Sequence, residues 1–414
     1  MPNQPPLSRL PSPITVMWCG AFIMTLSLGI RHSFGLFLQP MSLDNGWGRE
    51  VFALSIALQN LTWGLVQPVV GRLADRHGAA LTMVGGGILY ALGLVLMSHA
   101  NSPGLLALSA GLLIGLGLSG TTFPVVFGAI SRVMPAEQRS MAMGISMALG
   151  SLGQFAFLPG GLFLINHTGW SETLLIFSAL ALLILALAYP LLRLGKPASE
   201  TATSNNPAPL GVGATLARAL RHRPFQMLSF GYFVCGFQVI FISVHLPSYI
   251  LDKGIVATAG SNALALIGLF NILGSYLAGL WGGRIRKPLL LTGIYGLRAV
   301  VIVAFLSLPL SEWSVYLFAA CMGVLWLSTV PLTTGTVGVM FGVGNVGMLG
   351  GLVFLFHQLG AFIGGWLGGA LFDLTGSYTL VWWISIALSV VAAAVNWPIA
   401  EKAWAAPNHK PVAA

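Results

Sequence analysis

The sequence predicts an all-α polytopic membrane protein of twelve transmembrane helices, arranged as two pseudo-symmetric six-helix bundles. Three observations support this fold class. Of the 414 residues, 56% are hydrophobic and only 7% are charged, whereas a soluble domain carries about 25% charged residues. The apolar runs continue for about 20 residues without alternation, which favours helices over a β-barrel. The second half of the chain also repeats the first.

The chain contains twelve apolar segments that are long enough to span a bilayer as helices. We place them at 14–41, 51–71, 80–99, 104–131, 140–165, 172–192, 225–251, 261–283, 288–309, 313–340, 347–372 and 378–399. The 19 Lys and Arg residues lie in the two tails and the even-numbered loops, except for Arg31, Arg49, Lys253 and Arg298. Lys and Arg are enriched in cytoplasmic loops. We therefore expect both termini in the cytoplasm, and the net charge of +9 requires no nucleic-acid partner.

The segments fall into two halves that are joined by a polar linker. We expect a cytoplasmic tail, a six-helix half, a cytoplasmic linker, a second six-helix half and a second cytoplasmic tail, at 1–13, 14–192, 193–224, 225–399 and 400–414. The first tail is polar and proline-rich and lacks the apolar core of a signal peptide. The linker is rich in Ser, Thr, Asn and Pro, which is typical of a flexible connection.

A shift of 207 residues brings the two halves into register. The shift pairs Gly29 with Gly236, Pro40 with Pro247, Thr122 with Thr329, Pro124 with Pro331 and Gly161 with Gly368. The second and eighth segments need an offset near 211, which pairs Asn60 with Asn271. Two six-helix repeats of parallel orientation are typical of alternating-access transporters.

The loop after the second segment carries the most specific motif of the chain. It reads GRLADRHG and runs from Gly71 through Asp75 and Arg76 to Gly78. This motif resembles the loop between the second and third helices of the major facilitator superfamily, and the resemblance extends over essentially the whole chain. It implies the major facilitator fold, with these four residues in a charge-relay latch that closes the cytoplasmic side. Residues 79–80 are alanines, where the family usually has Arg or Lys.

A finer resemblance is to bacterial members of the monocarboxylate-porter and oxalate–formate-antiporter branches. It rests on GIRHSFGLFLQP at 29–40, CGFQVIFISVHLPSYILDKG at 235–254 and FHQLGAFIGGWLGG at 356–369. In the animal monocarboxylate carriers a lysine lies in the first helix near the place of His32. In both branches an arginine of the eighth helix helps to bind the carboxylate. Ser275 stands nearest that position here, so the second cationic group of the family is missing.

The charges inside the membrane favour an anionic substrate. All ten acidic residues lie in loops or at segment ends, so no carboxylate sits at mid-membrane to neutralise an organic cation. Arg31 lies inside the first segment, where a charge costs roughly 2.5–3.5 kcal/mol on insertion scales and therefore faces a wet cavity or a partner. Its guanidinium matches a carboxylate in bidentate geometry. Arg31 is our main candidate for substrate binding, with a structural role as the alternative.

Polar residues in other segments are further candidates for the substrate site. Gln238 is the counterpart of Arg31 in the repeat, and we expect the two to face each other across the pseudo-twofold axis. His32, His245 and His357 lie within the membrane, and one of them could carry a proton because no buried acid is available. A neutral hydrogen-bonding role is the alternative for each. The remaining candidates, which could also serve only to join helices, are Gln358, Asn60, Asn271, Thr122 and Thr329.

Motifs for catalysis are missing from the sequence. It contains no P-loop lysine signature, no cluster with metal-ligand spacing and no triad with a buried acid, so we expect no enzyme activity, no metal and no cofactor. Cys19, Cys235 and Cys321 lie within apolar segments and imply no disulfide framework.

We therefore expect a secondary active transporter that moves a small organic anion, a monocarboxylate, by alternating access, with proton coupling left open. One alternative is an efflux carrier for apolar or weakly charged compounds, in which Arg31 is structural. Another is a non-transporting membrane sensor on the same scaffold. The expected partners are the anion, protons if transport is coupled, and the lipid bilayer. We expect a monomer in a bacterial inner membrane.

Overall fold

The computed structural model describes residues 11–192 and 212–403, and these ranges are helical apart from short turns and ends. Most of the two expected tails and residues 193–211 of the expected linker lie outside the described residues. The rest of that linker is not all irregular, because Val212–Arg221 forms the helix α10.

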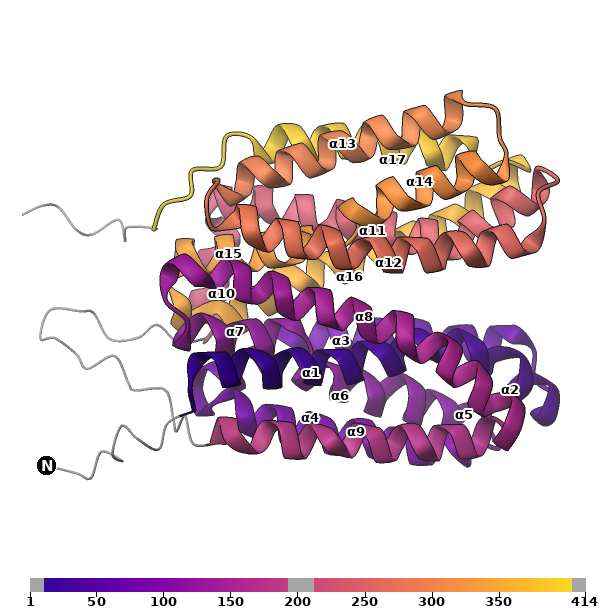
Figure 1. Cartoon of the computed structure of the whole chain (residues 1–414), viewed down its shortest axis with the longest axis horizontal. Coiled ribbons are helices and arrows are strands. Elements are labelled where there is room, and N and C mark those ends of the chain that lie inside the picture. Colours follow the sequence, from indigo (N-terminus) through magenta and orange to yellow (C-terminus); the bar gives the residue numbers. More distant parts are fainter. Residues whose placement is uncertain (1–10, 193–211, 404–414) are drawn as a thin grey trace, which may run out of the picture.

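The first half contains α1 to α9, which form the lower bundle in Figure 1. In chain order the elements are α1 (Pro13–His32), η2 (Ser33–Phe37), α2 (Leu38–Asn45), α3 (Arg49–His77), α4 (Ala79–Ser98), α5 (Pro103–Leu106), η3 (Ala107–Leu113), α6 (Ile114–Thr121), α7 (Phe123–Val133), α8 (Ala136–Thr168) and α9 (Trp170–Leu192). The first expected segment is thus a run of three elements, and the fourth is a run of four.

The second half contains α11 to α17, whose long helices form the upper bundle in Figure 1. After α10 the elements are α11 (Arg223–Asp252), α12 (Ala257–Gly282), α13 (Lys287–Ser307), α14 (Glu312–Leu325), α15 (Thr329–Phe341), η4 (Val343–Asn345), α16 (Val346–Thr375) and α17 (Thr379–Asn396). Across the described ranges, eleven helical stretches are long and apolar enough to cross a membrane. The expected segment that is not among these eleven is the second, which forms α3; this helix has 29 residues and carries the polar side chains of Gln59, Asn60 and Gln67.

The fourth and tenth segments are both broken at positions that the repeat relates. The first break separates α6 from α7 at Thr122, where the backbone is extended. The second separates α14 from α15 just before Thr329. Pro124 and Pro331 follow the two breaks by two residues. Because proline has no N–H, it is tolerated only in the first turn of a helix without loss of a hydrogen bond, which explains why both segments restart there.

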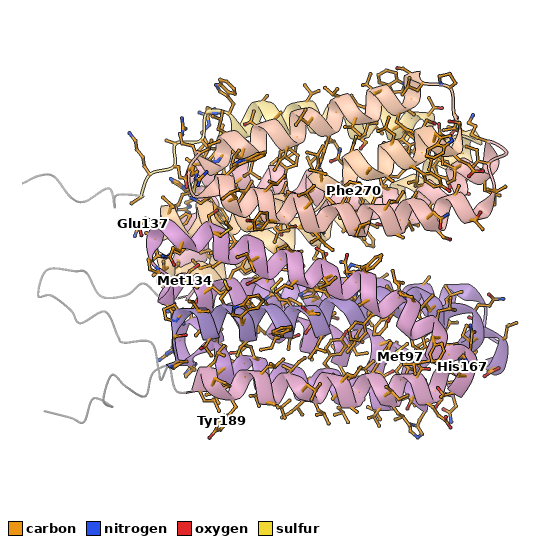
Figure 2. All side chains as sticks on the ribbon, in the orientation of Figure 1. Met97, Met134, Glu137, His167, Tyr189 and Phe270 are labelled. Carbon is orange, nitrogen blue, oxygen red and sulfur yellow. The ribbon has the colours of Figure 1, made fainter. Side chains whose placement is uncertain are left out.

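We call the end of the molecule at which α1 begins and α9 ends the linker face, and the opposite end the far face. The linker face is on the left in Figure 1. Figure 2 shows Met134 and Glu137 at the linker face and His167 near the far face.

The halves meet along two helix pairs, α3 with α16 and α8 with α12. A Cβ atom on Gly144 of α8 would lie 2.5 Å from Cα of Gly279 of α12. A Cβ atom on Gly351 of α16 would lie 2.7 Å from the carbonyl oxygen of Gln67 and 3.0 Å from Cα of Pro68. The two contacts are equivalent in the repeat, because the offset of 207 relates Gly144 to Gly351 and the offset of 211 relates Pro68 to Gly279. Small residues thus let both pairs of backbones approach closely.

We predict that Gly144→Val prevents the two halves from closing at the linker face. Overpacking of a close helix contact typically costs about 1–3 kcal/mol. A reporter cysteine at Ser140→Cys, in a background without the natural cysteines, is buried one turn away on α8. Its reaction with a maleimide should become faster. Gly160→Ala is the control, because a Cβ atom there meets nothing within 4 Å. Equal reaction rates in the two variants would contradict the close-packed interface.

Candidate functional site

Arg31 lies in the last turn of α1, and its guanidinium bonds a residue of α3, one of the helices at the interface between the halves. Its Nη2 donates a hydrogen bond of 2.9 Å to Oδ1 of Asn60 on α3. Its Nε is buried, with no hydrogen-bond partner within the described ranges. The two ion pairs of the described residues, Arg132–Asp75 and Lys287–Glu401, do not include Arg31. The guanidinium therefore keeps donor capacity and positive charge for an anion.

Asn60 connects Arg31 to the second half. Its main-chain carbonyl accepts a hydrogen bond of 3.1 Å from Nε2 of Gln358 on α16. Gly64, one turn further along α3, makes room for Gln358, because a Cβ atom there would lie 2.8 Å from Cβ of Gln358. The structure thus brings together three of the predicted site residues, Arg31, Asn60 and Gln358, from three helices and both halves.

Aromatic rings from both halves pack one turn closer to the linker face. The ring centroid of Phe354 on α16 lies 4.8 Å from that of Trp63 on α3 and 4.9 Å from that of Phe123 on α7. All three side chains are buried. Nε1 of Trp63 donates to Oε1 of Gln67 at 3.0 Å, so the polar edge of the indole is satisfied. These rings form an apolar floor below the polar cluster of Arg31, Asn60 and Gln358.

The second helix pair carries a hydrogen bond at the equivalent place. Nδ2 of Asn271 on α12 donates to Oγ of Ser151 on α8 at 2.7 Å. The repeat offsets relate Asn271 to Asn60 and Ser151 to Gln358. The other side of Asn271 differs, because its Oδ1 accepts from the backbone N–H of Leu327 at 2.9 Å. Asn271 therefore supports the break between α14 and α15 and holds no arginine.

The expectation that Gln238 faces Arg31 does not hold in this structure. Gln238 is buried, and its Oε1 accepts a hydrogen bond of 3.1 Å from Nη1 of Arg298. Its Nε2 donates to the hydroxyl groups of Ser385 and Ser389 on α17. A buried arginine needs acceptors, and Gln238 is one of those that Arg298 finds. The pseudo-symmetry is broken here, because the amide of Gln238 bonds Arg298 inside the second half.

Arg298 of α13 is fully buried and satisfies the backbone at a helix break. Its Nη2 donates to the main-chain carbonyls of Leu325, at 2.7 Å, and of Trp326. These carbonyls end α14, where the last turn has no intrahelical partners. Nη2 also lies 3.6 Å from Sγ of Cys235. The hydrogen bonds of Arg298 therefore stabilise the interior of the second half.

The three membrane histidines lie in different surroundings. Nδ1 of His32 is 2.7 Å from the carbonyl of Leu28, and its ring is exposed. Nε2 of His245 is 2.9 Å from the carbonyl of Gly365. His357 is buried next to Gln358, and its Nδ1 has no hydrogen-bond partner among the residues that the structure describes. Two of the three are sequence neighbours of the polar cluster, because His357 precedes Gln358 on α16 and His32 follows Arg31 on α1.

Thr122 and Thr329 serve the two helix breaks. Both are buried. Oγ1 of Thr122 bonds the carbonyl of Leu118 at 2.7 Å, and Oγ1 of Thr329 lies 3.2 Å from Sγ of Cys235. These hydroxyl groups are therefore already engaged inside their own halves, and their partners among the described residues do not include the cluster around Arg31.

Asp75 near the end of α3 forms the closest polar contact across the linker face. Its Oδ2 accepts from the backbone N–H of Met348 at 2.8 Å, and its Oδ1 accepts from that of Gly347 at 3.2 Å. These N–H groups open α16, where a carboxylate is stabilised by the unpaired donors and the helix dipole. Arg132 of α7 pairs with Asp75 at 2.6 Å. Gly71 completes the contact, because a Cβ atom there would lie 2.0 Å from the carbonyl oxygen of Gly347.

The side chain of Arg76 is exposed at the linker face, and the ion pair of Asp75 is with Arg132. Sequence reasoning missed Arg132. The available signal was a basic residue in the last turn of the fourth segment. Gly78 ends α3 with φ of +100°, a conformation that glycine adopts without strain. At the position equivalent to Asp75 the second half has Arg286, which donates to the carbonyl of Ile399.

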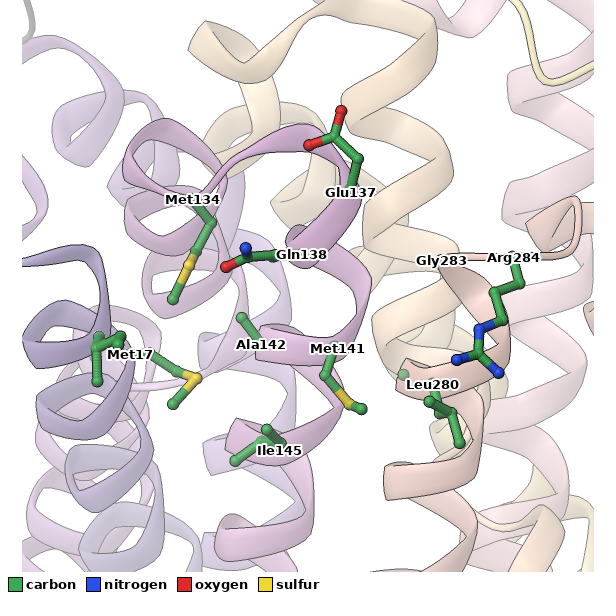
Figure 3. Close-up of a pocket in the computed structure, with 12 residues that line it drawn as sticks. Met17, Met134, Glu137, Gln138, Met141, Ala142, Ile145, Leu280, Gly283 and Arg284 are labelled. Atoms are coloured by element: carbon green, nitrogen blue, oxygen red, sulfur yellow. The ribbon is translucent and has the colours of Figure 1, made fainter.

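A cavity of about 400 Å³ opens at the linker face between α1, α8 and α12. Its wall is rich in methionine, including Met17, Met134 and Met141 (Figure 3). Glu137 and Arg284 lie at its rim. The cavity shares no residue with the cluster around Arg31, so it is separate from the candidate site.

We predict that Asp75→Asn weakens closure at the linker face without unfolding the protein. Asn keeps the shape but loses the charge, and a charged hydrogen bond is worth about 1.5–3 kcal/mol. The reaction of the Ser140→Cys reporter with maleimide should therefore become roughly ten- to a hundredfold faster. Arg76→Gln is the control, because it removes an exposed charge one residue away. An unchanged rate in Asp75→Asn would remove Asp75 from the latch.

A second variant tests the structural role of Arg298. Arg298→Leu leaves the carbonyls of Leu325 and Trp326 and the amide of Gln238 without their donor, and each unsatisfied buried group costs roughly 1–3 kcal/mol. The melting temperature should fall sharply. Leu297→Ala, at an exposed neighbouring position, should change it little. If Arg298→Leu melts as the control does, the helix break is held by other contacts.

Known proteins of one family resemble this chain in sequence and in fold. The family model described as Major Facilitator Superfamily matches residues 17–365. Monocarboxylate transporter 13 of Bos taurus is 30% identical over 371 residues, which cover 86% of this chain and 82% of the relative. The Bacillus subtilis protein named Uncharacterized MFS-type transporter YcxA is 24% identical, over 94% of this chain and 96% of the relative.

A solved structure shows the same fold. The Escherichia coli fucose:proton symporter FucP superposes with a TM-score of 0.74 at 13% identity, over 94% of this chain and 98% of that chain. The predicted fold class and the family resemblance are thereby confirmed. The match to the family model covers most of the chain. The chain therefore belongs to the Major Facilitator Superfamily, and it is an integral-membrane secondary transporter rather than an enzyme.

Proposed function

We propose that this transporter carries a small organic anion, a monocarboxylate, and that the carboxylate binds to Arg31. The observation that carries this proposal is a guanidinium that bonds Asn60 of an interface helix and has a buried, unpartnered Nε and no acidic partner among the described residues. Asn60 holds the guanidinium in place through a single hydrogen bond. A relative that is named a monocarboxylate transporter supports the same substrate class.

The same contacts suggest how the anion would drive alternating access. Arg31 and Asn60 belong to the first half, whereas Gln358 belongs to the second half and bonds Asn60 directly. An anion at Arg31 is therefore within reach of groups from both halves. A ligand shifts a conformational equilibrium only by its difference in affinity for the two states. A site that is built from both halves provides such a difference, because its geometry changes when the halves move.

The orientation of the protein follows from its charges. Lys and Arg cluster at the linker face, so we place this face and both termini in the cytoplasm, in the inner membrane of a bacterium. The halves 14–192 and 225–399 would then rock as two units of a monomer. The cross-half contacts described above all lie between the linker face and the level of Asn60 and Asn271. In this orientation the structure is closed toward the cytoplasm.

The aromatic floor favours a second candidate, an efflux carrier for apolar compounds. Trp63, Phe123 and Phe354 come from both halves and pack on each other here, so they would offer ring surface to an apolar ligand when the halves move apart. In that case Arg31 would serve only the structure. The two candidates differ in whether binding requires a negative charge on the ligand.

Variants of Arg31 separate the two candidates. Arg31→Lys keeps the charge but loses the planar fork, so the affinity for the anion should fall while the preference for anions persists. Arg31→Gln removes the charge and should lower the affinity roughly ten- to a hundredfold, because a charged hydrogen bond is worth about 1.5–3 kcal/mol. The probes are lactate, pyruvate, butyrate and phenylacetate, each compared with its uncharged amide. Affinity and melting temperature are measured on the same preparations.

Arg76→Gln is the matched control, since it removes an exposed cation of the same half and should leave the affinity unchanged. A well-folded Arg31→Gln protein that binds the anion as the wild type does would overturn the proposed site. Equal binding of the acids and their amides would instead favour the efflux carrier.

A further inference from the structure

The methionine-rich cavity at the linker face is built from both halves. Its wall takes Met17 from α1, Met141 and Ile145 from α8, and Leu280 from α12 (Figure 3). Methionine side chains are flexible and adapt to apolar ligands of irregular shape. The volume of about 400 Å³ is in the range of sites for small organic ligands. The cavity therefore has the size and the lining to receive part of an acyl chain.

The apolar faces that line the cavity continue along two of its helices as exposed surface. On α1, Trp18 follows the lining residue Ile14 by four residues, and both side chains are exposed. On α12, the exposed Tyr276 precedes the lining residue Leu280 by four residues. Residues four apart on a helix share a face, and an exposed apolar surface of this kind is typical of contact with a membrane. The cavity therefore opens onto surface that lipid chains cover.

The rim of the cavity carries one charge of each sign. Glu137 lies in the first turn of α8, and Arg284 follows the end of α12 by two residues. The two segments approach closely, because a Cβ atom on Gly283 would lie 3.3 Å from the carbonyl oxygen of Glu137. Both charged side chains are exposed, and neither belongs to an ion pair of the described residues. The rim therefore offers an acid of the first half and a cation of the second half to one ligand.

The rim lies at the level of the lipid head groups. Trp281, in the last turn of α12, is exposed, and tryptophan is enriched at the boundary between membrane and water. The charged residues Arg284, Arg286 and Lys287 follow it directly in the sequence. A ligand that fits the cavity thus has an apolar chain on the membrane side and a charged group at the rim.

The helix pair beside the cavity lacks the charged contact that the other pair has. At α3 and α16, the carboxylate of Asp75 binds the backbone N–H groups that open α16. The equivalent position of the second half is Arg286, whose guanidinium donates to the carbonyl of Ile399. In the described part of the chain, no charged side chain of α8 or α12 bonds the opposite half. A head group that binds both Glu137 and Arg284 would supply the missing contact.

We propose that the cavity binds a phospholipid with an ethanolamine head group, and that this lipid holds the linker face closed. The ammonium group pairs with Glu137, the phosphate pairs with Arg284, and an acyl chain lies against the methionine wall. An anionic lipid would satisfy Arg284 but would be repelled by Glu137. Because the lipid contacts both halves, it binds best when they are close together, and it shifts the equilibrium toward that state. The proposal does not depend on the transported substrate.

Binding of short-chain lipids to the delipidated, full-length protein tests the proposal. The probes are dioctanoyl phosphatidylethanolamine and dioctanoyl phosphatidylglycerol. The wild type should bind the ethanolamine lipid about fivefold more tightly, as expected for one partly exposed charge pair. Glu137→Gln should remove this preference, and Arg284→Gln should weaken the binding of both lipids by a similar factor. Glu172→Gln and Arg76→Gln are the matched controls, because they remove exposed charges away from the cavity.

A reporter on the other helix pair tests the effect on closure. Ser131 is buried on α7, three residues after Gly128, where a Cβ atom would lie 3.4 Å from the backbone nitrogen of Gly347 on α16. In a background without the natural cysteines, the ethanolamine lipid should slow the reaction of Ser131→Cys with a maleimide severalfold. Met141→Trp fills the cavity and should abolish this effect. Leu152→Trp, at an exposed position further along α8, should preserve it.

Melting temperatures report folding, and Glu137→Ala and Arg284→Met replace any glutamine variant that does not fold. Equal wild-type affinities for the two lipids, or affinities that the Glu137 and Arg284 variants leave unchanged, would overturn the proposal. Tighter binding of the glycerol lipid would assign the cavity to an anionic lipid instead. Bound ethanolamine lipid that does not slow the reporter would overturn its role in closure. A dimer that Met141→Trp converts to a monomer would mean that a second copy of the chain fills the cavity.

Discussion

The cost of placing arginine side chains inside a membrane governs the interior of this transporter. For Arg298 this cost is offset by hydrogen bonds to carbonyl groups that a helix break leaves free, and to the amide of Gln238. For Arg31 the cost is offset only in part, by its hydrogen bond to Asn60. The difference decides their roles, because the satisfied cation stabilises the fold and the unsatisfied one has capacity for a ligand.

Pseudo-symmetry sets where the halves touch, and departures from it set what the contacts do. The close approaches at Gly144 and Gly351 are equivalent, as are the hydrogen bonds of Asn60 and Asn271. The carboxylate of Asp75 has no equivalent, since Arg286 stands at that position. The pair α3 and α16 therefore has a charged contact to a helix N-terminus, whereas the pair α8 and α12 is joined by close backbone packing and the hydrogen bond between Asn271 and Ser151.

The contact of Asp75 at the linker face and the contact of Asn60 with Gln358 in the candidate site join the same two helices, α3 and α16. Asp75 and Asn60 lie on α3, and both reach α16, at its first turn and at Gln358. The aromatic floor lies between these two levels. A change at the cluster around Arg31 therefore acts on the same helix pair that holds the linker face closed, with no further element needed to transmit it.

The sequence by itself determined the fold class, the two repeats and the family, because apolar length, loop charge and internal register depend on the order of residues alone. It also identified Arg31, Asn60 and Gln358 as site candidates, since polar groups are costly in a membrane wherever they point. Only the tertiary structure decided their partners. Gln238 bonds Arg298, and Asp75 pairs with Arg132. Nδ1 of His357 has no hydrogen-bond partner among the described residues. These outcomes depend on which side chain of another helix lies within about 3 Å, a distance that the sequence of one helix does not specify.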